Sequence, residues 1–461
     1  MYTTLYKYAR MAFPSGRTVQ RRLKRLLETQ WLSPAELRAL QLQRIKRLVE
    51  HAYSNVPFYG QRFREAGIHP NDIKTLDDFR RIPRLTRSDI QHNLESLIAT
   101  NFPDSALHRD ATGGSTGEPL RFYHNIDYDY WNWAAGFRVW DWLNVEPGCR
   151  QAWIDGSGGF VNSSGFLKTV LKKSKRWLKR EKWLNTFDMT EDKMQAFAKT
   201  LERFQPELIF GCNSGIWLFA RYLEEAGFVG RICPKAIIGG SEKLYDFQRE
   251  LIEEVFGCRV TDYYGSREGG LMAAQCPYGS MHWSSELRYL EIIADGQPAE
   301  PGEIGEMIVT DLTNFAMPFI RYENGDIARL DDQPCPCGRG LPVLGELVGR
   351  KSDFFTTPEG RLISGLYFVR MLRGWPGVKK YQVHQPSVDK VEIAFEAGED
   401  LDETWLAGRR QEFQAYLGES VQLSFKRVEH IPLTPAGKHL FTTSAVPVDM
   451  SSRRDLEVVR E

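Results

Sequence analysis

The sequence has no excess charge of either sign, few cysteines and no long apolar run. Sixty lysines and arginines balance sixty aspartates and glutamates among 461 residues, so no global field favours nucleic acid. No stretch approaches the roughly 18 apolar residues of a membrane span, and the N-terminus lacks the apolar core of a secretory signal. We therefore expect a cytoplasmic protein that binds no nucleic acid.

Seven cysteines in so long a chain do not form a disulfide framework. Four of them stand alone in the sequence and are expected to be reduced, buried packing residues, namely Cys149, Cys212, Cys233 and Cys258. The other three, Cys276, Cys335 and Cys337, are considered below as metal ligands.

Length and pattern predict an α/β protein with a large multi-subdomain N-terminal domain and a small mobile C-terminal α/β domain. We expect the large domain at residues 1–349, a hinge at 350–353 and the small domain at 354–461. Ser33, Pro34 and Glu36 form a helix-start signal, and the apolar spacing predicts helix over residues 32–65.

The segment from about residue 152 to 292 alternates helix-like stretches with short apolar runs at 208–210, 236–238 and 259–263. This alternation predicts a mostly parallel sheet. Strand-like runs at 306–310 and 318–322 indicate a β-rich subdomain that closes the large domain. Beyond residue 349 we expect strands at 380–384, 390–395 and 421–427 around a helix at 401–417.

Two basic stretches, residues 7–25 and 168–182, are expected to be solvated helix faces. The alternative is peripheral contact with an anionic membrane or a carrier, because Trp177 and Trp183 lie among the lysines as in an interfacial helix.

Residues 111–124 read ATGGSTGEPLRFYH, a loop whose bare backbone amides and hydroxyls suit phosphate oxygens. The loop is not a Walker motif, because no Gly-Lys-Ser/Thr follows. Further motifs follow in order: IIGGSEKL at 237–244, DYYGSREGG at 262–270, RYENGDIARL at 321–330, GRKSDFF at 349–355 and LTPAGKHL at 433–440.

In this order and at these separations, the motifs resemble those of the adenylate-forming superfamily of acyl-CoA synthetases and adenylation domains. The N-terminal VEHAYSNVPFYGQRFREAGIHPNDIKTLDDFRRIPRLTRSDI, the segment TDLTNFAMPFIRYENGD and CPCGRGLP are most similar to the phenylacetate-CoA ligase family, especially its relatives in capsule and surface-polysaccharide biosynthesis. The resemblance covers nearly the whole chain. It implies that ATP activates a carboxylic acid to an acyl-adenylate with release of pyrophosphate, and that the acyl group then passes to a thiol, with coenzyme A as the expected acceptor.

The resemblance also implies roles for individual residues. The β and γ phosphates of ATP would be held by Thr112, Ser115, Thr116 and Gly117, and the adenine and acyl pockets would be lined by Gly239, Gly240 and Ser241. Tyr264 would pack on the adenine, with Gly265 also in the nucleotide site. Asp326 would accept the ribose hydroxyls, Arg350 would add a ribose contact, and Glu268 would ligate Mg²⁺.

The small domain would supply Lys438, which reaches the α-phosphate and the carboxylate in the first half-reaction. Because the two half-reactions need different groups over the same phosphate, we expect rotation about Asp353 between two closed states. Lys438, Glu268 and Arg267 form the expected catalytic set.

Two positions depart from the family pattern. Arg267 stands where a threonine commonly precedes the motif glutamate, and Leu120 replaces the usual lysine after the loop proline. Arg267 can still contact a phosphate or shape the acyl pocket, so the acyl specificity stays open.

Cys276, His282, Cys335 and Cys337 provide three thiolates and an imidazole, the ligand set of a closed, structural Zn²⁺ site. Relatives in the resembled family carry a comparable cluster. The alternative is a set of buried, unligated thiols.

Other functions remain open from the sequence. Adenylation followed by transfer to an amine, such as an amino sugar, or to a carrier thiol uses the same first step. A non-catalytic nucleotide-binding scaffold is the alternative from another class, supported only by Arg267 and Leu120. The sequence does not distinguish a monomer from a dimer.

Overall fold

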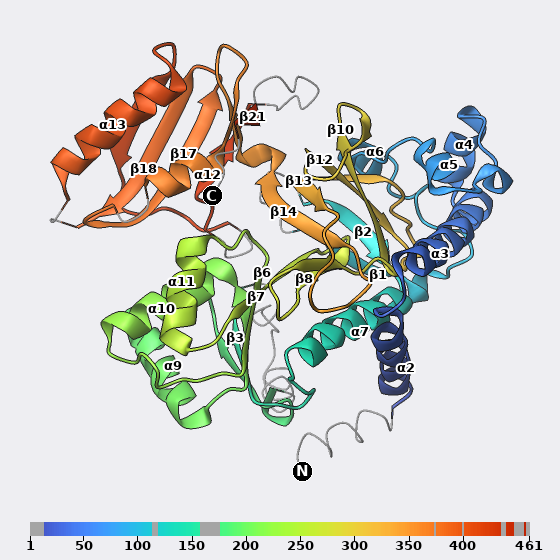
Figure 1. Ribbon diagram of the computed structural model, residues 1–461, viewed down its shortest axis with the longest axis horizontal. Helices are drawn as coiled ribbons and strands as arrows, with labels where there is room; N and C mark the ends of the chain where they lie inside the picture. The colour runs from blue at the N-terminus through green and yellow to red at the C-terminus, as the bar shows by residue number, and fades with distance from the viewer. Residues whose placement is uncertain are drawn as a thin grey trace.

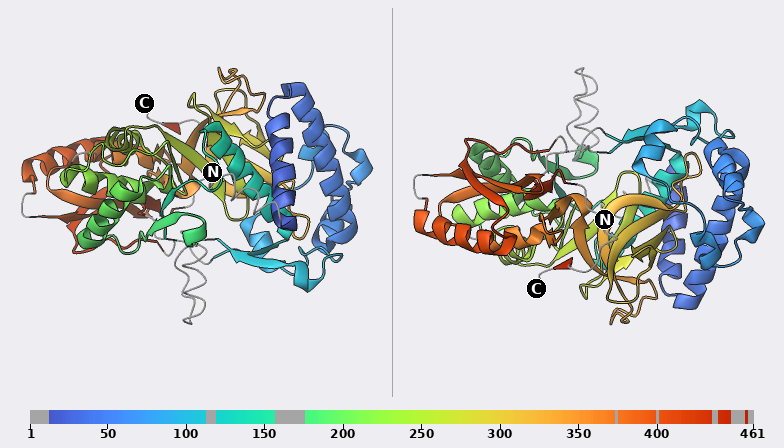
Figure 2. Two further views of the ribbon diagram at one scale, coloured as in Figure 1. Left: turned by 90° about the horizontal axis from the view of Figure 1, so that it is seen from below. Right: turned by 90° about the horizontal axis from the view of Figure 1, so that it is seen from above.

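The computed structural model describes residues 13–112, 119–156, 176–372, 375–398, 401–434, 439–446 and 456–457. Figures 1 and 2 place the N-terminal helices at the end of the molecule opposite the C-terminal lobe. A mixed α/β body with one large sheet lies between these two ends, which confirms the predicted fold class.

Helices dominate residues 13–106: α2 (Pro14–Thr29), α3 (Pro34–Asn55), α4 (Pro57–Glu65), η1 (Pro70–Asp72), α5 (Leu76–Arg80), α6 (Arg87–His92) and η2 (Asp104–Ala106). The predicted cap of α3 is confirmed, since Ser33 accepts from the Glu36 amide and Glu36 accepts from the Ser33 amide. The predicted helical stretch over 32–65 is confirmed as two helices, which are separated at Val56, because Pro57 disfavours helical geometry in the residue before it.

A twelve-stranded sheet runs through the body in the order β11-β10-β12-β13-β14-β9-β8-β7-β6-β5-β3-β4. Its parallel half confirms the predicted strands and consists of β3 (Gln151–Ile154), β4 (Glu181–Leu184), β5 (Leu208–Cys212), β6 (Ala236–Gly240) and β7 (Val260–Ser266). The helices between its strands are α9 (Glu191–Phe204), α10 (Asn213–Glu225) and α11 (Asp246–Phe256), which lie beside the parallel strands (Figure 1).

The antiparallel half comprises β8 (Gly270–Gln275), β9 (Met281–Trp283), β10 (Arg288–Ala294), β11 (Gln297–Pro298), β12 (Ile304–Asp311), β13 (Tyr322–Asp331) and β14 (Val343–Arg350). The strand expected at 318–322 is wrong. The chain there is irregular until β13 begins, because Pro318 has no amide hydrogen to donate and Arg321 has a positive φ of 51°. The two predicted subdomains therefore share one sheet, which changes from parallel to antiparallel between β7 and β8.

A separate hairpin of β1 (His108–Ala111) and β2 (Arg121–His124) flanks residues 113–118. The following helix, α7 (Ile126–Trp142), packs against α2 and β8. Apolar side chains of α2, α7 and the parallel strands share one buried cluster. Of the four cysteines expected to be buried, Cys149 and Cys212 are buried, whereas Cys258 is partly exposed and Cys233 is exposed.

The C-terminal lobe contains η3 (Lys351–Asp353), β15 (Phe354–Thr356), β16 (Leu362–Ser364), α12 (Gly365–Met371), β17 (Val378–Ser387), β18 (Lys390–Ala397), α13 (Glu403–Leu417), β19 (Gln422–Arg427), β20 (Thr442–Ser444) and β21 (Leu456–Glu457). Its main sheet has the order β19-β18-β17-β20, and α13 contributes Phe413 and Leu417 to a core of its own. The predicted strands and helix of this region are confirmed.

No helix in the described parts of the chain has the length and apolar character needed to cross a membrane. Of the two tryptophans in the second basic stretch, Trp177 is 76% exposed, whereas Trp183 stacks on Trp153 of β3 at a centroid distance of 4.9 Å. Packing against Trp153 therefore explains the position of Trp183. Contact of the two basic stretches with an anionic membrane or a carrier remains a hypothesis.

Candidate active site

A cleft of about 1430 Å³ opens where the sheet changes from parallel to antiparallel. The β7–β8 turn, β13, the end of β14 and the first residues of the C-terminal lobe form its walls.

Glu268 lies in the tight turn between β7 and β8 and is only 6% exposed. Burial raises the pKa of this carboxyl group, since removal from water disfavours its charged form. The turn is closed by the Ser266 hydroxyl, which accepts from the Gly269 amide at 2.9 Å. Glu268 borders the cleft, so a cation bound there would favour the carboxylate form.

A fully buried ion pair supports this turn from within the protein. Arg288 and Asp311 are both 0% exposed and lie 2.9 Å apart. Arg288 also donates to the Gly269 carbonyl, and to the Asn132 side-chain oxygen at 2.8 Å. The same Asn132 oxygen accepts from the Leu271 amide, so both sides of the Glu268 turn are fixed. Sequence reasoning missed Arg288, because nothing in its local pattern identifies it as a support.

Arg267 points to the other side of the same turn. Its guanidinium forms an ion pair with Asp110 of β1 at 3.0 Å, and its side chain is 46% exposed. The Tyr128 hydroxyl donates to the Arg267 carbonyl at 2.6 Å. Arg267 therefore joins the β7–β8 turn to the hairpin that flanks the expected phosphate loop, and its charge stays accessible to the cleft.

Asp326 and Arg350 face each other as partners in the β13–β14 ladder. The Arg350 Nε donates to one Asp326 oxygen at 3.1 Å, while the Tyr264 hydroxyl and the Asn324 amide donate to the other oxygen. The Asp326 charge raises the pKa of Arg350, and burial followed by the same charge raises the pKa of Tyr264. Three of about four acceptor positions of the carboxylate are thus used within the protein.

Two polar residues in the cleft escaped the sequence prediction. Asn324 orients both Tyr264 and Asp326, with its amide 2.9 Å from an oxygen of each. Lys243 borders the cleft and donates to the Val348 carbonyl at 3.2 Å. Both lie inside the quoted motifs, RYENGD and GGSEK, and their polar side chains were the available signal.

The three residues at and after the end of β6 differ in what they contact. A Cβ on Gly239 would lie 2.0 Å from the Asn213 side-chain oxygen, and one on Gly240 would lie 2.6 Å from the Tyr263 carbonyl oxygen. Close packing thus explains both glycines, while Ser241 borders the cleft in a left-handed conformation with φ of 71°. Gly265 borders the cleft as well. Ligand contacts by all four remain predictions.

Thr112 lies at the edge of the cleft where the expected phosphate loop begins. Its amide donates to the Leu120 carbonyl, and its hydroxyl accepts from the Leu120 amide at 3.0 Å. Leu120 is 0% exposed, so its position packs into the core. Ser115, Thr116, Gly117 and Lys438 lie outside the described residues, and their roles remain predictions.

The predicted hinge begins where β14 ends. Asp353 accepts from the Arg350 amide at 2.8 Å, and Gly349 has φ of 143°, in the positive region. Loss of hydration raises the pKa of Asp353 to about 6. Asp353 therefore fixes the turn between the body and the C-terminal lobe in this conformation, and rotation about it remains a prediction.

The cysteines and histidine predicted as a zinc site come together. Sγ of Cys276 lies 3.6 Å from Sγ of Cys335, and Sγ of Cys337 lies 3.2 Å from Nε2 of His282. These separations approach the edges of a tetrahedron with Zn–S of ~2.3 Å and Zn–N of ~2.0 Å. The other ring nitrogen of His282 is 2.9 Å from the Leu341 carbonyl, which leaves Nε2 free to bind metal. Burial raises the pKa of Cys276 to about 11, so a cation is needed to hold it as a thiolate.

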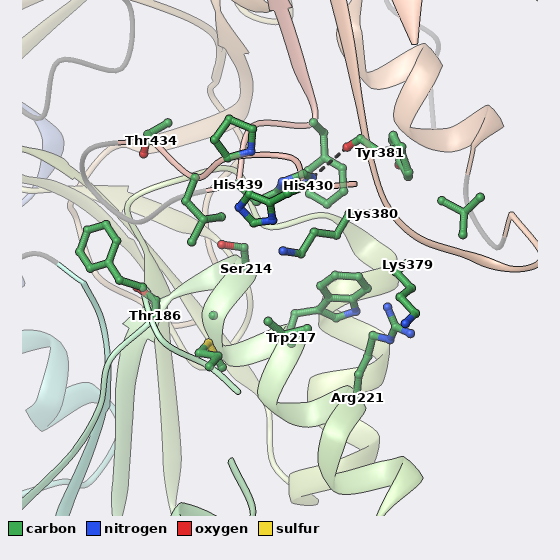
Figure 3. Close-up of a pocket in the computed structure, with 18 of the residues that line it drawn as sticks. Thr186, Ser214, Trp217, Arg221, Lys379, Lys380, Tyr381, His430, Thr434 and His439 are labelled. Atoms are coloured by element: carbon green, nitrogen blue, oxygen red, sulfur yellow. Dashed lines mark hydrogen bonds between the residues drawn. The ribbon is translucent and has the colours of Figure 1, made fainter. Parts of the chain in front are cut away.

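A second cavity of about 1030 Å³ lies between the body and the C-terminal lobe. Its walls combine Trp217 and Arg221 of α10 with Lys379 and Lys380 of β17 (Figure 3). Among the described residues, three buried polar atoms of its lining have no hydrogen-bond partner: Thr186 Oγ1, Trp375 Nε1 and His439 Nδ1. Burial lowers the pKa of His439 to about 4, so this ring is neutral.

Comparisons with known proteins identify the family of this chain. Protein CapK of Staphylococcus aureus is 24% identical over 426 residues, which cover 89% of this chain and 90% of CapK. The phenylacetate-coenzyme A ligase of Escherichia coli K12 is 30% identical over 335 residues, which cover 69% of this chain and 72% of the ligase. The chain belongs to the phenylacetate-CoA ligase family. It is thus an enzyme of the AMP-forming carboxylate ligases, and residues 355–445 match the family model of the CapK C-terminal domain.

Solved structures share the fold. A 2-hydroxyisobutyryl-CoA ligase in its postadenylation state, in complex with an acyl-AMP, superposes with a TM-score of 0.70 at 19% identity, covering 90% of each chain. The same ligase in its thioesterification state, with the acyl-AMP and coenzyme A, gives a TM-score of 0.60 at 20% identity, covering 90% of this chain and 91% of the ligase chain. Both comparisons confirm the adenylate-forming fold.

Proposed function

We propose that this enzyme condenses a carboxylic acid with ATP to an acyl-adenylate, and transfers the acyl group to a thiol, with coenzyme A as the acceptor. The observation that carries the proposal is that Glu268, Arg267 and the Asp326–Arg350 pair border one cleft. The ligase activity of the relatives, named as phenylacetate-coenzyme A ligases, supports it.

In the first half-reaction, a carboxylate oxygen attacks the α-phosphorus, and the bond to the bridging oxygen breaks to release pyrophosphate. Negative charge accumulates between two anions, so fixed cations are needed where it develops. Arg267 and Lys243 border the cleft and are the cations proposed for this task. Bound Mg²⁺, held by Glu268, would neutralise phosphate charge.

The Asp326–Arg350 pair would hold the ribose. Because three donors already occupy the Asp326 carboxylate, it has capacity for about one ribose hydroxyl. The second hydroxyl would accept from Arg350, whose guanidinium has further N–H groups. This division modifies the expectation that Asp326 accepts both hydroxyls.

In the second half-reaction, a thiolate sulfur attacks the acyl carbon and AMP leaves. The second cavity is the proposed entry for the acceptor, because it lies between the two lobes and carries Lys379, Lys380 and Arg221. These cations suit the phosphates of coenzyme A. Coenzyme A is bound by the 2-hydroxyisobutyryl-CoA ligase of similar fold.

Carboxylate-dependent exchange of labelled pyrophosphate into ATP tests the first step across a broad panel of carboxylic and amino acids. We expect exchange with at least one acid, abolished in Asp326→Ala. Thioester formation with coenzyme A, compared with amide formation with an amino sugar, then tests the acceptor. Failure of the protein to bind ATP would refute the proposal, and exclusive amide formation would refute the thiol acceptor.

We also propose that the Cys276, His282, Cys335 and Cys337 cluster holds a structural Zn²⁺. Its ligands tie the 335–341 loop to β9, and Gly340 of that loop packs against the Leu32 carbonyl of the N-terminal helices. Elemental analysis should find zinc that is lost in Cys335→Ser together with folding stability. A zinc-free protein of unchanged stability would contradict this assignment.

A further inference from the structure

A second group of side chains that could hold a metal ion contains two imidazoles and a carboxylate but no thiol. His108 of β1 and His124 of β2 are directly opposed in the hairpin register. Asp129, one turn into α7, lies 3.2 Å from Nδ1 of His108 through one oxygen and 3.2 Å from Nε2 of His124 through the other. Asp129 also borders the cleft.

The ligand separations match those around a small cation. Metal–nitrogen and metal–oxygen bonds of ~2.0–2.2 Å give edges of roughly 3.0–3.4 Å between neighbouring ligands. Each imidazole nitrogen lies within this range of a different Asp129 oxygen, and one ligand atom from each of the three residues lies within 4.8 Å of the others. The side chain of His108 is 42% exposed, so its ring has room to adjust around a bound ion.

The three side chains come from parts of the fold that are otherwise held in place. His124 is 8% exposed, and its ring packs against Phe122 and Tyr128. Tyr128 in turn donates to the Arg267 carbonyl of the β7–β8 turn. The buried imidazole of His124 is therefore already oriented, and ordering it at binding costs little.

We propose that His108, His124 and Asp129 bind a first-row divalent cation, with Zn²⁺ as the probe of choice. Two imidazoles and a carboxylate suit such borderline cations better than Ca²⁺ or Mg²⁺, which prefer oxygen ligands. Three protein ligands leave at least one coordination position for water from the cleft. The bound ion would cross-link β1, β2 and α7 at the base of the hairpin that flanks residues 113–118.

This site differs from the proposed structural zinc in ligand chemistry, so one experiment separates them. Co²⁺ bound by three thiolates gives intense sulfur-to-metal charge-transfer absorption, whereas Co²⁺ bound by nitrogen and oxygen gives only weak visible bands. Full-length protein would be stripped with chelator and titrated with Co²⁺ and then Zn²⁺. The variants are Cys335→Ser, the double variant His108→Gln and His124→Gln, and the matched control His92→Gln, an exposed histidine on α6.

We expect Cys335→Ser to retain one bound ion without charge-transfer absorption. The double variant should lose that weak component, with at least about a tenfold drop in affinity, and keep the charge-transfer band. His92→Gln should behave as wild type. If Cys335→Ser misfolds, the weak visible absorption of Co²⁺ bound by nitrogen and oxygen is obtained by subtracting the spectrum of the double variant from that of the wild type. The proposal would be overturned if the double variant bound as many ions as the wild type with the same affinity. It would also be overturned if, at micromolar metal, the wild type bound no ion beyond the one held by the cysteines.

Discussion

The two walls of the cleft are held together in different ways. The wall that carries Glu268 rests on Arg288 and Asp311, a pair that is wholly buried and bonded to the turn itself. The wall formed by the C-terminal lobe is connected to the body through residues 349–353, and a cavity of about 1030 Å³ lies between this lobe and α10.

This difference concerns packing as well as charge. Protein cores contain few voids larger than a water molecule, so a cavity of this size with unpartnered polar atoms indicates an interface that has not packed as a core. Contact between the lobes is made largely by aromatic rings, such as Tyr245 and Phe247 against Phe441. One wall is built to stay fixed, and the other is compatible with movement, as weakly packed domain interfaces generally are.

Breaking the fixed wall should have the largest effect. Arg288→Leu leaves Asp311 buried without its partner, and such a loss typically costs about 3–5 kcal/mol. Urea unfolding should show a correspondingly lower free energy of unfolding, while Lys24→Ala, at a highly exposed pair with Glu28, should change it little. Equal stability of the two variants would contradict the bracing role of Arg288.

Lys438→Ala tests whether the C-terminal lobe serves only one half-reaction. We expect adenylate formation to slow by ~10²-fold or more, the scale of losing one preorganised charge contact. Transfer from chemically supplied acyl-AMP should stay within a few fold. The matched control is Lys426→Ala, an exposed lysine of the same lobe on β19. Equal losses in both half-reactions would argue against a separate role for Lys438.

Asp353→Pro tests movement of the lobe directly. Proline restricts the backbone at the proposed hinge, so thioester or amide transfer should slow by about tenfold while adenylation changes less. The two half-reactions would be followed separately, with near-ultraviolet circular dichroism to establish that the variant is folded. A variant that is folded and slows adenylation more than transfer would place the hinge elsewhere.

Local sequence patterns predicted most of the helices and strands, because these depend on nearby spacing. The cap at Ser33, the strands of the parallel half and the approach of Cys276 to Cys335 all followed from residue type and spacing. The broken helix at Val56 could have been predicted from Pro57 alone.

Long-range contacts were not predictable in the same way. Arg288 reaches the Glu268 turn and Asp311 across the sheet, and the β1–β2 register brings His108 to His124, so both depend on the complete fold. The joining of the two predicted subdomains into one sheet also depends on how β7 pairs with β8. Local spacing in the sequence does not encode which strands pair, so these contacts could not be predicted from it.

The smallest expected effect is a pH dependence at the boundary between the two walls. Loss of hydration raises the pKa of Asp353 from its ordinary value to about 6, so the folded state holds this proton more tightly than the unfolded chain. The protonated carboxyl group of Asp353 therefore contributes its full stabilisation to the folded state below about pH 4, and this contribution is lost as the pH rises through 6. Asp353→Asn keeps an oxygen for the Arg350 amide but has no charge to desolvate. Relative to wild type, the free energy of unfolding of Asp353→Asn should therefore rise by about 1 kcal/mol between pH 4 and pH 7. This rise is smaller than the ~3 kcal/mol that a shift of two pKa units would give, because water in the cleft screens the carboxylate. Urea titrations at both pH values would measure the difference, and a relative stability independent of pH would show that Asp353 is ionised at no cost in the folded protein.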